Sequence, residues 1–211
     1  MSLATYNDLT AAVQAWLIDR TDLVSRIPDF IRMAELRIYR MLRIRAMEMT
    51  LNSDIASDGT LALPSDYIEL KNAYVNTTPY IELERQTPEY IYKMFPYSGQ
   101  TGVPMVIARL GENFIFAPYP DSTYTVIGIY YGYLPALSDS NPTNWFMTNA
   151  PELLLFGALC EAVPYLHEKD YSDERVVWET KFQTILNDVK MQDKREWRSG
   201  SRVIGKAIPR P

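Results

Sequence analysis

The chain contains one cysteine and one histidine, Cys160 and His167, and both lie in the stretch LLLFGALCEAVPYLHEKD. This stretch is expected to be helical, with Pro151 in its first turn. Seven residues return to nearly the same face of a helix, but they advance about 10.5 Å along its axis. A thiolate and its catalytic base must approach within about 3 Å. The two side chains therefore cannot form a catalytic dyad.

Metal chemistry based on these two residues is equally disfavoured. A zinc site needs about four ligands, and the chain offers one Cys and one His. We predict that Cys160 is a small buried residue and that His167 is a polar residue near a helix end. Neither a metal site nor a cofactor site is expected.

Carboxylates are the remaining candidates for chemistry. The sequence lacks a phosphate loop, a dinucleotide-binding fingerprint, a nucleophile elbow and the HExxH motif. Glu82 and Glu84 are expected on the same side of a strand, and a glycosidase uses such a carboxylate pair. Same-side acidic residues on a half-exposed strand usually form its solvent face. A carboxylate-dependent hydrolase is therefore only an alternative, and we predict that the chain is not an enzyme.

Composition indicates a globular protein with an uneven distribution of charge. Its 211 residues are 47% hydrophobic and 12% aromatic, and tyrosine is the commonest aromatic residue. The formal net charge is −5. Residues 190–211 contain seven basic and two acidic residues, whereas the other 189 residues contain 14 basic and 24 acidic residues. A basic end on an acidic body suggests docking to an acidic partner, either a nucleic acid or a protein.

Cysteine usage and hydropathy favour folding in a reducing cytoplasm, with no membrane association. A single Cys allows no internal disulfide framework. The N-terminal stretch shows no basic segment of the kind that opens a secretory signal. The longest apolar run, Leu153–Cys160, is far shorter than the roughly 20 residues that a membrane-spanning helix needs.

Helical periodicity marks both ends of the chain. The stretch LATYNDLTAAVQAWLIDRTD predicts a first helix capped by Thr5 or Asn7, and RIPDFIRMAELRIYRMLRIRAM predicts a second helix with Pro28 in its first turn. Two more helices are expected near the C-terminus, with Pro164 kinking or ending the first of them. The apolar side of the last helix is expected to contain Val177, Phe182, Ile185, Leu186 and Val189.

The polar face of the second helix is strongly basic. Glu35 is the one acidic residue on it, and this face admits two interpretations. It is either a solvated face with basic residues near the helix C-terminus or a face that meets an acidic partner or lines a channel. The residues concerned are Arg32, Arg37, Arg40, Arg43 and Arg45.

Between the helices, alternating apolar residues and turn signals predict a small antiparallel β module. The stretch PMVIARLGENFIFAPYP is typical of a hairpin with a Gly-Glu-Asn turn. The predicted fold is α+β. A helical bundle domain comprises residues 1–48 and 148–193, and an inserted β domain comprises residues 49–147. An extended docking tail is expected over residues 194–211, because glycine and proline interrupt it.

The order of these pieces resembles one family. The relevant stretches are RIPDFIRMAELRIYRMLR, GTLALPSDYIELKNAYV, FIFAPYP, IGIYYGYLPALS and NWFMTNAPELLLFGALCEAVPYL. Across residues 5–190 they are similar to the head-to-tail adaptor proteins of short-tailed bacteriophages. The resemblance implies a structural protein of the virion neck, assembled in the host cytoplasm. Its fold would be a helical bundle with a β domain.

The resemblance also implies partners. Such adaptors form a ring of twelve copies beneath the portal protein, carry the tail nozzle or fibre proteins, and let DNA pass. For the expected contact with a tail component we select Tyr90, Tyr92 and Tyr97. For the expected contact with the portal or a neighbouring copy we select Arg195, Trp197, Arg198, Arg202, Val203, Ile204, Lys206 and Arg210.

The main alternative is a nucleic-acid-binding module that uses the arginine-rich helix and the basic tail. The acidic body argues against it, because its field repels phosphates.

Overall fold

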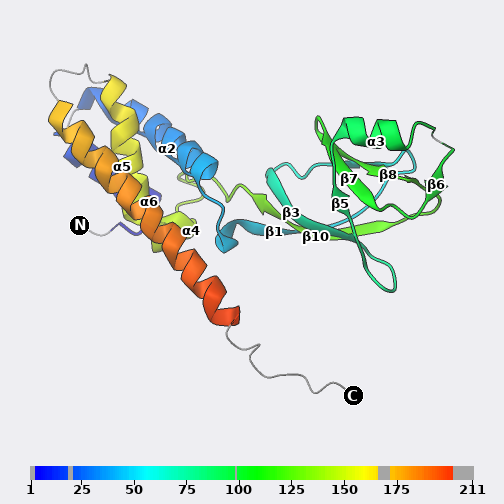
Figure 1. Ribbon diagram of the computed structural model, residues 1–211. Helices are drawn as coiled ribbons and strands as arrows, with labels where there is room; N and C mark the ends of the chain where they lie inside the picture. The colour runs from blue at the N-terminus through cyan, green and yellow to red at the C-terminus, as the bar shows by residue number, and fades with distance from the viewer. Residues whose placement is uncertain (1–2, 19–20, 98, 166–171, 202–211) are drawn as a thin grey trace. The chain divides into compact units, whose positions relative to one another are not determined.

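The computed structural model divides the chain into two compact units. The helical unit comprises Met1–Ala46 and Leu134–Pro211, and the β unit comprises Met47–Tyr133 (Figure 1). The structure describes residues 3–18, 21–97, 99–165 and 172–201, without the side chains of 21, 172, 173 and 198–201. Its helices and predominantly antiparallel strands agree with the expected α+β class.

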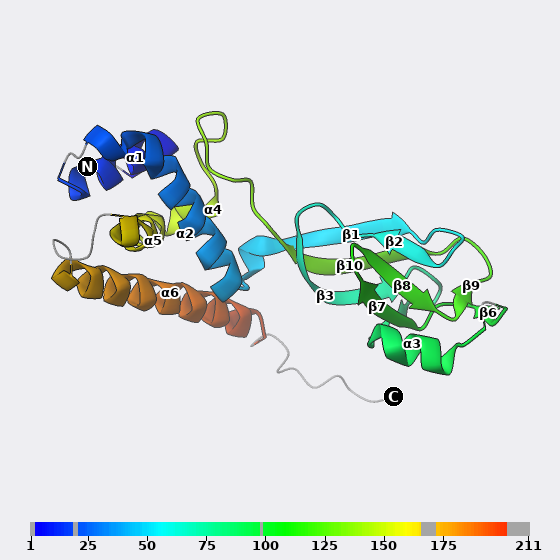
Figure 2. The same ribbon diagram turned by 90° about the horizontal axis from the view of Figure 1, so that it is seen from above.

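The helical unit is built around helix α5. Among the described residues, α5 is buried along almost its whole length, and α1, α2, α4 and α6 all pack against it (Figure 2). The helices are α1 (Tyr6–Trp16), α2 (Ile27–Met41), α4 (Trp145–Asn149), α5 (Pro151–Ala162) and α6 (Ser172–Ser201). Short 3-10 segments cover Thr21–Arg26, Arg45–Met47 and Val163–Tyr165.

Local signals set most of the helix boundaries. Thr5 caps α1 through a capping box with Asp8. Pro28 and Pro151 lie in the first turns of α2 and α5, where the missing N–H has no helical partner to lose. Pro164 falls in the 3-10 segment after α5, so that helix ends where the sequence predicted.

The predicted start of an extended tail at Lys194 is wrong, because α6 continues to Ser201. Arg45 binds two carboxylates on the distal part of this helix, Asp193 and Glu196. A glycine such as Gly200 costs only about 1 kcal/mol in a helix. The predicted apolar face is also shifted. Val177 is exposed, while Trp178 is buried together with Phe182, Leu186 and Val189.

The β unit contains two four-stranded sheets. One has the order β1-β10-β3-β4, formed by Glu48–Asp54, Thr125–Gly132, Tyr67–Val75 and Ile81–Glu82. The other has the order β2-β8-β7-β5, formed by Thr60–Ala62, Asn113–Ala117, Val106–Leu110 and Glu84–Arg85. The longer pairings are antiparallel, and the predicted hairpin is β7–β8, with Gly111 at positive φ in its turn.

Two short pairings depart from the predicted antiparallel pattern. Strand β5 runs parallel to β7, and β6 (Thr101–Gly102) runs parallel to β9 (Tyr119–Pro120). Apolar side chains from both sheets, including Leu70, Val126 and Phe116, form the core of this unit. Helix α3 (Pro88–Met94) packs on the second sheet through Ile91.

The β unit ends earlier than the predicted boundary at residue 147. Strand β10 stops at Gly132, and the segment that follows belongs to the helical unit. Its backbone is held by α2, since the Tyr39 hydroxyl donates to the Leu134 carbonyl and the Leu137 N–H donates to Glu35. These bonds join residues about 100 positions apart, and the local sequence pattern does not reveal them.

Candidate interaction surfaces

Cys160 is a buried residue of α5, as the sequence predicted. Burial raises the pKa of its thiol to about 12, and the nearby negative charge of Glu179 adds to this effect. A thiol that stays protonated at neutral pH is a poor nucleophile. His167 lies outside the described residues.

The raised pKa of Cys160 predicts a change of stability at alkaline pH. Above pH 9 the unfolded chain releases the thiol proton while the folded chain retains it, so the thiol's contribution to stability falls as pH rises toward 12. We expect Cys160→Ala to cost about 1 kcal/mol at pH 7 through a small cavity. Urea unfolding should show a smaller difference in stability between wild type and Cys160→Ala at pH 10.5 than at pH 7. A difference that is the same at both pH values would contradict the raised pKa of the Cys160 thiol.

Glu82 and Glu84 do not form a carboxylate pair on one strand. Glu82 ends β4, which pairs with β3, whereas Glu84 begins β5, which pairs with β7. The buried Leu83 separates them, and Glu84 accepts a hydrogen bond from Gln86 at 2.6 Å. Across the described part of the chain, no three His, Cys, Asp or Glu side chains are grouped so that they can hold a metal ion.

Arg37 lies between three helices. Its guanidinium donates to Glu179 on α6 at 2.5 Å and to Glu161 on α5 at 3.5 Å. It also lies 4.4 Å from the centre of the Phe182 ring, which allows a cation–π contact. Both of its acidic partners belong to this chain, so Arg37 joins α2 to α5 and α6.

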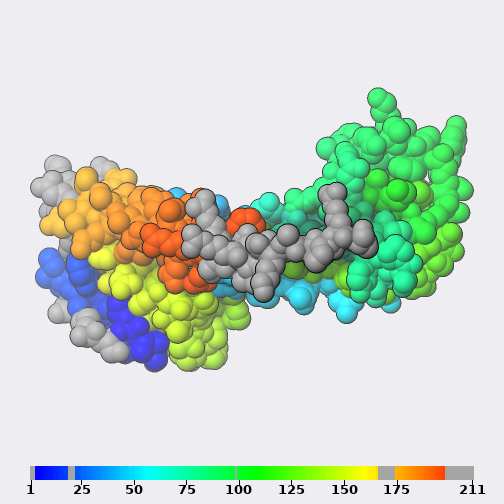
Figure 3. Space-filling view, turned by 60° about the horizontal axis from the view of Figure 1, so that its bottom comes forward, coloured from blue at the N-terminus to red at the C-terminus, as the bar shows by residue number. Residues whose placement is uncertain are grey.

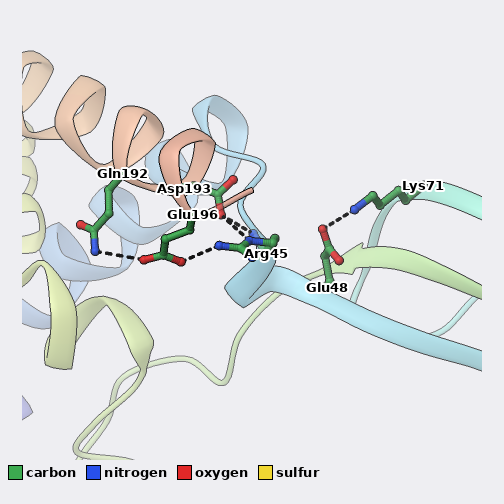
Figure 4. Close-up of polar contacts among 6 residues, drawn as sticks. All are labelled: Arg45, Glu48, Lys71, Gln192, Asp193 and Glu196. Carbon is green, nitrogen blue, oxygen red and sulfur yellow. Dashed lines mark hydrogen bonds and ion pairs between the residues drawn. The ribbon is translucent and has the colours of Figure 1, made fainter. Parts of the chain in front are cut away.

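Three further arginines of the predicted basic face are also engaged within the chain. Arg32 binds Glu35 at 3.1 Å, and Arg43 donates to the backbone carbonyls of Tyr39 and Leu42. Arg45 binds Glu196 at 2.5 Å and Asp193 at 3.5 Å (Figure 4). Arg40 is exposed. The five arginines therefore do not form a uniform cationic surface, and their role as a face for an acidic partner or a channel stays a prediction.

The C-terminal end of α6 presents a different set of side chains. Trp197 is 67% exposed, and Lys194 and Arg195 are also exposed. Figure 3 shows α6, in orange and red, on the surface of the helical unit. Arg198 lies in α6, but its side chain is outside the description. Arg202, Val203, Ile204, Lys206 and Arg210 all lie outside the described residues.

The β unit has an exposed aromatic patch at α3. Tyr90, Tyr92 and Tyr97 are 38%, 52% and 71% exposed, while Ile91 between them is buried. Met94 of α3 and Met105, which precedes β7, are also more than half exposed. Sequence reasoning selected the tyrosines and missed the methionines, because a Met in an apolar stretch gives no sign of its exposure.

Within the described residues, no helix has both the length and the apolar character of a membrane-spanning segment. Both compact units expose aromatic side chains, which are common at protein interfaces.

The family comparison identifies the kind of structural protein. The family model described as SU10 adaptor protein matches residues 4–204. The chain therefore belongs to the SU10 adaptor protein family, a family of phage head-to-tail adaptors. No curated protein matches the chain.

Proposed function

We propose that this chain is a structural, non-enzymatic subunit of the virion neck. Twelve copies form a ring that joins the portal to the tail nozzle or fibre proteins and continues the channel through which DNA passes. The observation that carries the proposal is the family match across nearly the whole chain. The exposed aromatic residues of both units support it, because large aromatic side chains commonly anchor protein interfaces.

The contact with the portal or a neighbouring copy is assigned to the end of α6 and the residues that follow it, with the portal anchor at the end of α6. Trp197 offers a large exposed ring, and Arg195 offers a guanidinium that can bind a carboxylate. Asp193 and Glu196 bind Arg45, which lies just after α2. These ion pairs hold the last turns of α6 against the helical unit. The anchor is thus preorganised, which reduces the entropy lost on binding.

The contact with a tail component is assigned to α3 and the loop after it. Tyr92 and Tyr97 are both more than half exposed, and buried Ile91 packs the helix on its sheet. Because this patch and Trp197 lie in different units, one can be changed without altering the fold of the other.

We predict that Trp197→Ala weakens binding to portal rings at least tenfold. Loss of a central aromatic anchor typically costs 2 kcal/mol or more of binding free energy, whereas an exposed residue contributes little to stability. Co-sedimentation of the full-length protein with purified portal rings of the same phage measures the effect.

The matched control for this experiment is Tyr97→Ala, in the other unit. It should leave portal binding unchanged and weaken capture of the nozzle or fibre protein. If Trp197→Ala binds the portal as wild type does, the end of α6 is not the anchor. Failure of the wild-type protein to form rings or to bind the portal would overturn the proposed function itself.

A further inference from the structure

Strand β1 is an open edge of its sheet. Among the described residues it pairs with β10 on one side, and it stands at the end of the order β1-β10-β3-β4 (Figure 2). Natural edge strands are commonly shortened or carry Lys or Pro, which prevents unwanted pairing. Strand β1 has seven residues, EMTLNSD, with neither Lys nor Pro. It is thus a suitable template for an added strand.

An apolar hollow adjoins this edge on one face of the same sheet. Its volume is about 510 Å³, and its lining includes Tyr74, Ile127 and Ile129. Thr50 and Asn52 of β1 form its polar border. A strand added beside β1 would bring every second side chain to this face.

The charge of the β unit selects a basic occupant. Residues 47–133 contain ten acidic and four basic residues, a net charge of −6. Two of the carboxylates, Glu48 and Asp54, are the first and last residues of β1. Glu48 binds Lys71 at 2.6 Å (Figure 4). Asp54 accepts a hydrogen bond from the Thr125 hydroxyl.

The chain itself contains a segment of matching chemistry at residues 202–211. This segment, RVIGKAIPRP, has three basic residues and no acidic side chain. Every second residue, beginning with Arg202, is basic or isoleucine, in the order Arg, Ile, Lys, Ile, Arg. The alternate positions hold Val, Gly, Ala and Pro. In an extended chain these two sets lie on opposite faces.

We propose that residues 202–211 of one copy add as a strand to the β1 edge of a neighbouring copy. Ile204 and Ile208 cover the apolar hollow, and the basic side chains face Glu48 and Asp54. Ten extended residues span about 33 Å, enough to follow the roughly 23 Å of a seven-residue strand. This inference rests on the proposed ring. It divides the C-terminal region into a portal anchor at the end of α6 and a following strand that links copies.

Truncation after Ser201 tests the proposal. It keeps α6 with Trp197 and its ion pairs to Arg45, so circular dichroism should be unchanged. Mass photometry should show rings for the full-length protein and mainly monomers for the truncated protein. Rings that form equally well after truncation would overturn the proposal. If truncation spares the ring and abolishes portal binding, the segment belongs to the portal contact instead.

A labelled synthetic peptide of residues 202–211 provides the second measurement. Fluorescence anisotropy should show saturable binding to the truncated protein, weakening as salt rises. Asn52→Arg places a like charge at the edge and should weaken this binding at least tenfold. The control is Ala62→Arg, an exposed position of β2 at the edge of the other sheet, which should have little effect. If the peptide does not bind, or if Asn52→Arg and Ala62→Arg weaken its binding equally, residues 202–211 do not add to the β1 edge. Absence of rings in the full-length protein would instead refute the proposed function.

Discussion

Glu35→Ala is expected to destabilise the helical unit by about 2–4 kcal/mol, the cost of leaving buried polar groups without partners. The Glu35 side chain is 1% exposed. Its Oε1 accepts hydrogen bonds from the Leu137 N–H at 3.1 Å and from the Asn144 side chain at 3.2 Å, while Oε2 binds Arg32. Alanine removes all three interactions at once.

The four tryptophans of the chain lie in the helical unit, so their fluorescence during urea unfolding reports on this unit. Glu35→Gln retains an acceptor oxygen for the Leu137 N–H but replaces Oε2, the acceptor for Arg32, with an NH2 donor. Because Arg32 is partly exposed and can turn to water, we expect a smaller loss than for alanine, about 1 kcal/mol. Asp188→Ala, at an exposed position of α6, serves as the control and should stay within about 0.5 kcal/mol of wild type. Equal stability of Glu35→Ala and wild type would show that Glu35 does not hold the Leu134–Asn144 segment.

Gly128→Ala is expected to destabilise the β unit by about 3 kcal/mol, near the upper end of the usual cost of overpacking. A Cβ at this position would lie 2.4 Å from the Asn72 carbonyl oxygen and 3.0 Å from the Ala73 Cα. Both are backbone atoms of β3, which pairs directly with β10. Since backbone atoms cannot rotate away as a side chain can, the two central strands of the sheet must separate.

Hydrogen exchange measured by mass spectrometry on peptides from β3 and β10 should show this loss as faster exchange, while peptides from α5 should be unchanged. The control is Gly102→Ala. A Cβ at Gly102 meets nothing within 4 Å, so its substitution should leave exchange in both strands as in wild type. Protection of β10 that survives in Gly128→Ala would mean that the sheet tolerates the extra methyl group.

Several features of the fold follow from short stretches of sequence. The helical spacing of apolar residues predicts an apolar stripe on the second helix, and all of its members are buried except the half-buried Met41. The stripe comprises Ile31, Ala34, Ile38, Met41 and Leu42. The sequence offers Thr5 or Asn7 as the cap of the first helix, and in the structure Thr5 caps α1. The Gly-Glu-Asn turn between apolar runs predicts the β7–β8 hairpin. Each of these signals acts over a few residues, so a linear sequence is sufficient to detect it.

The candidate surfaces were less predictable because exposure depends on packing. The sequence selected Tyr92, Tyr97, Arg195 and Trp197, and the structure shows all four as exposed. Their partners remain predictions. The arginine-rich face of α2 had two interpretations, and neither anticipated that most of its members bind groups within the same chain.

By itself the sequence determined the α+β class, the helices at both ends and the inserted strands. Only the tertiary structure decided that Glu35 is a buried anchor and that α6 extends to Ser201. It also decided that Arg37 and Arg45 bind carboxylates more than 120 residues away. The reason is physical. Helix periods and turn preferences arise from neighbouring residues, whereas the environment of a charge depends on which distant segments pack against it.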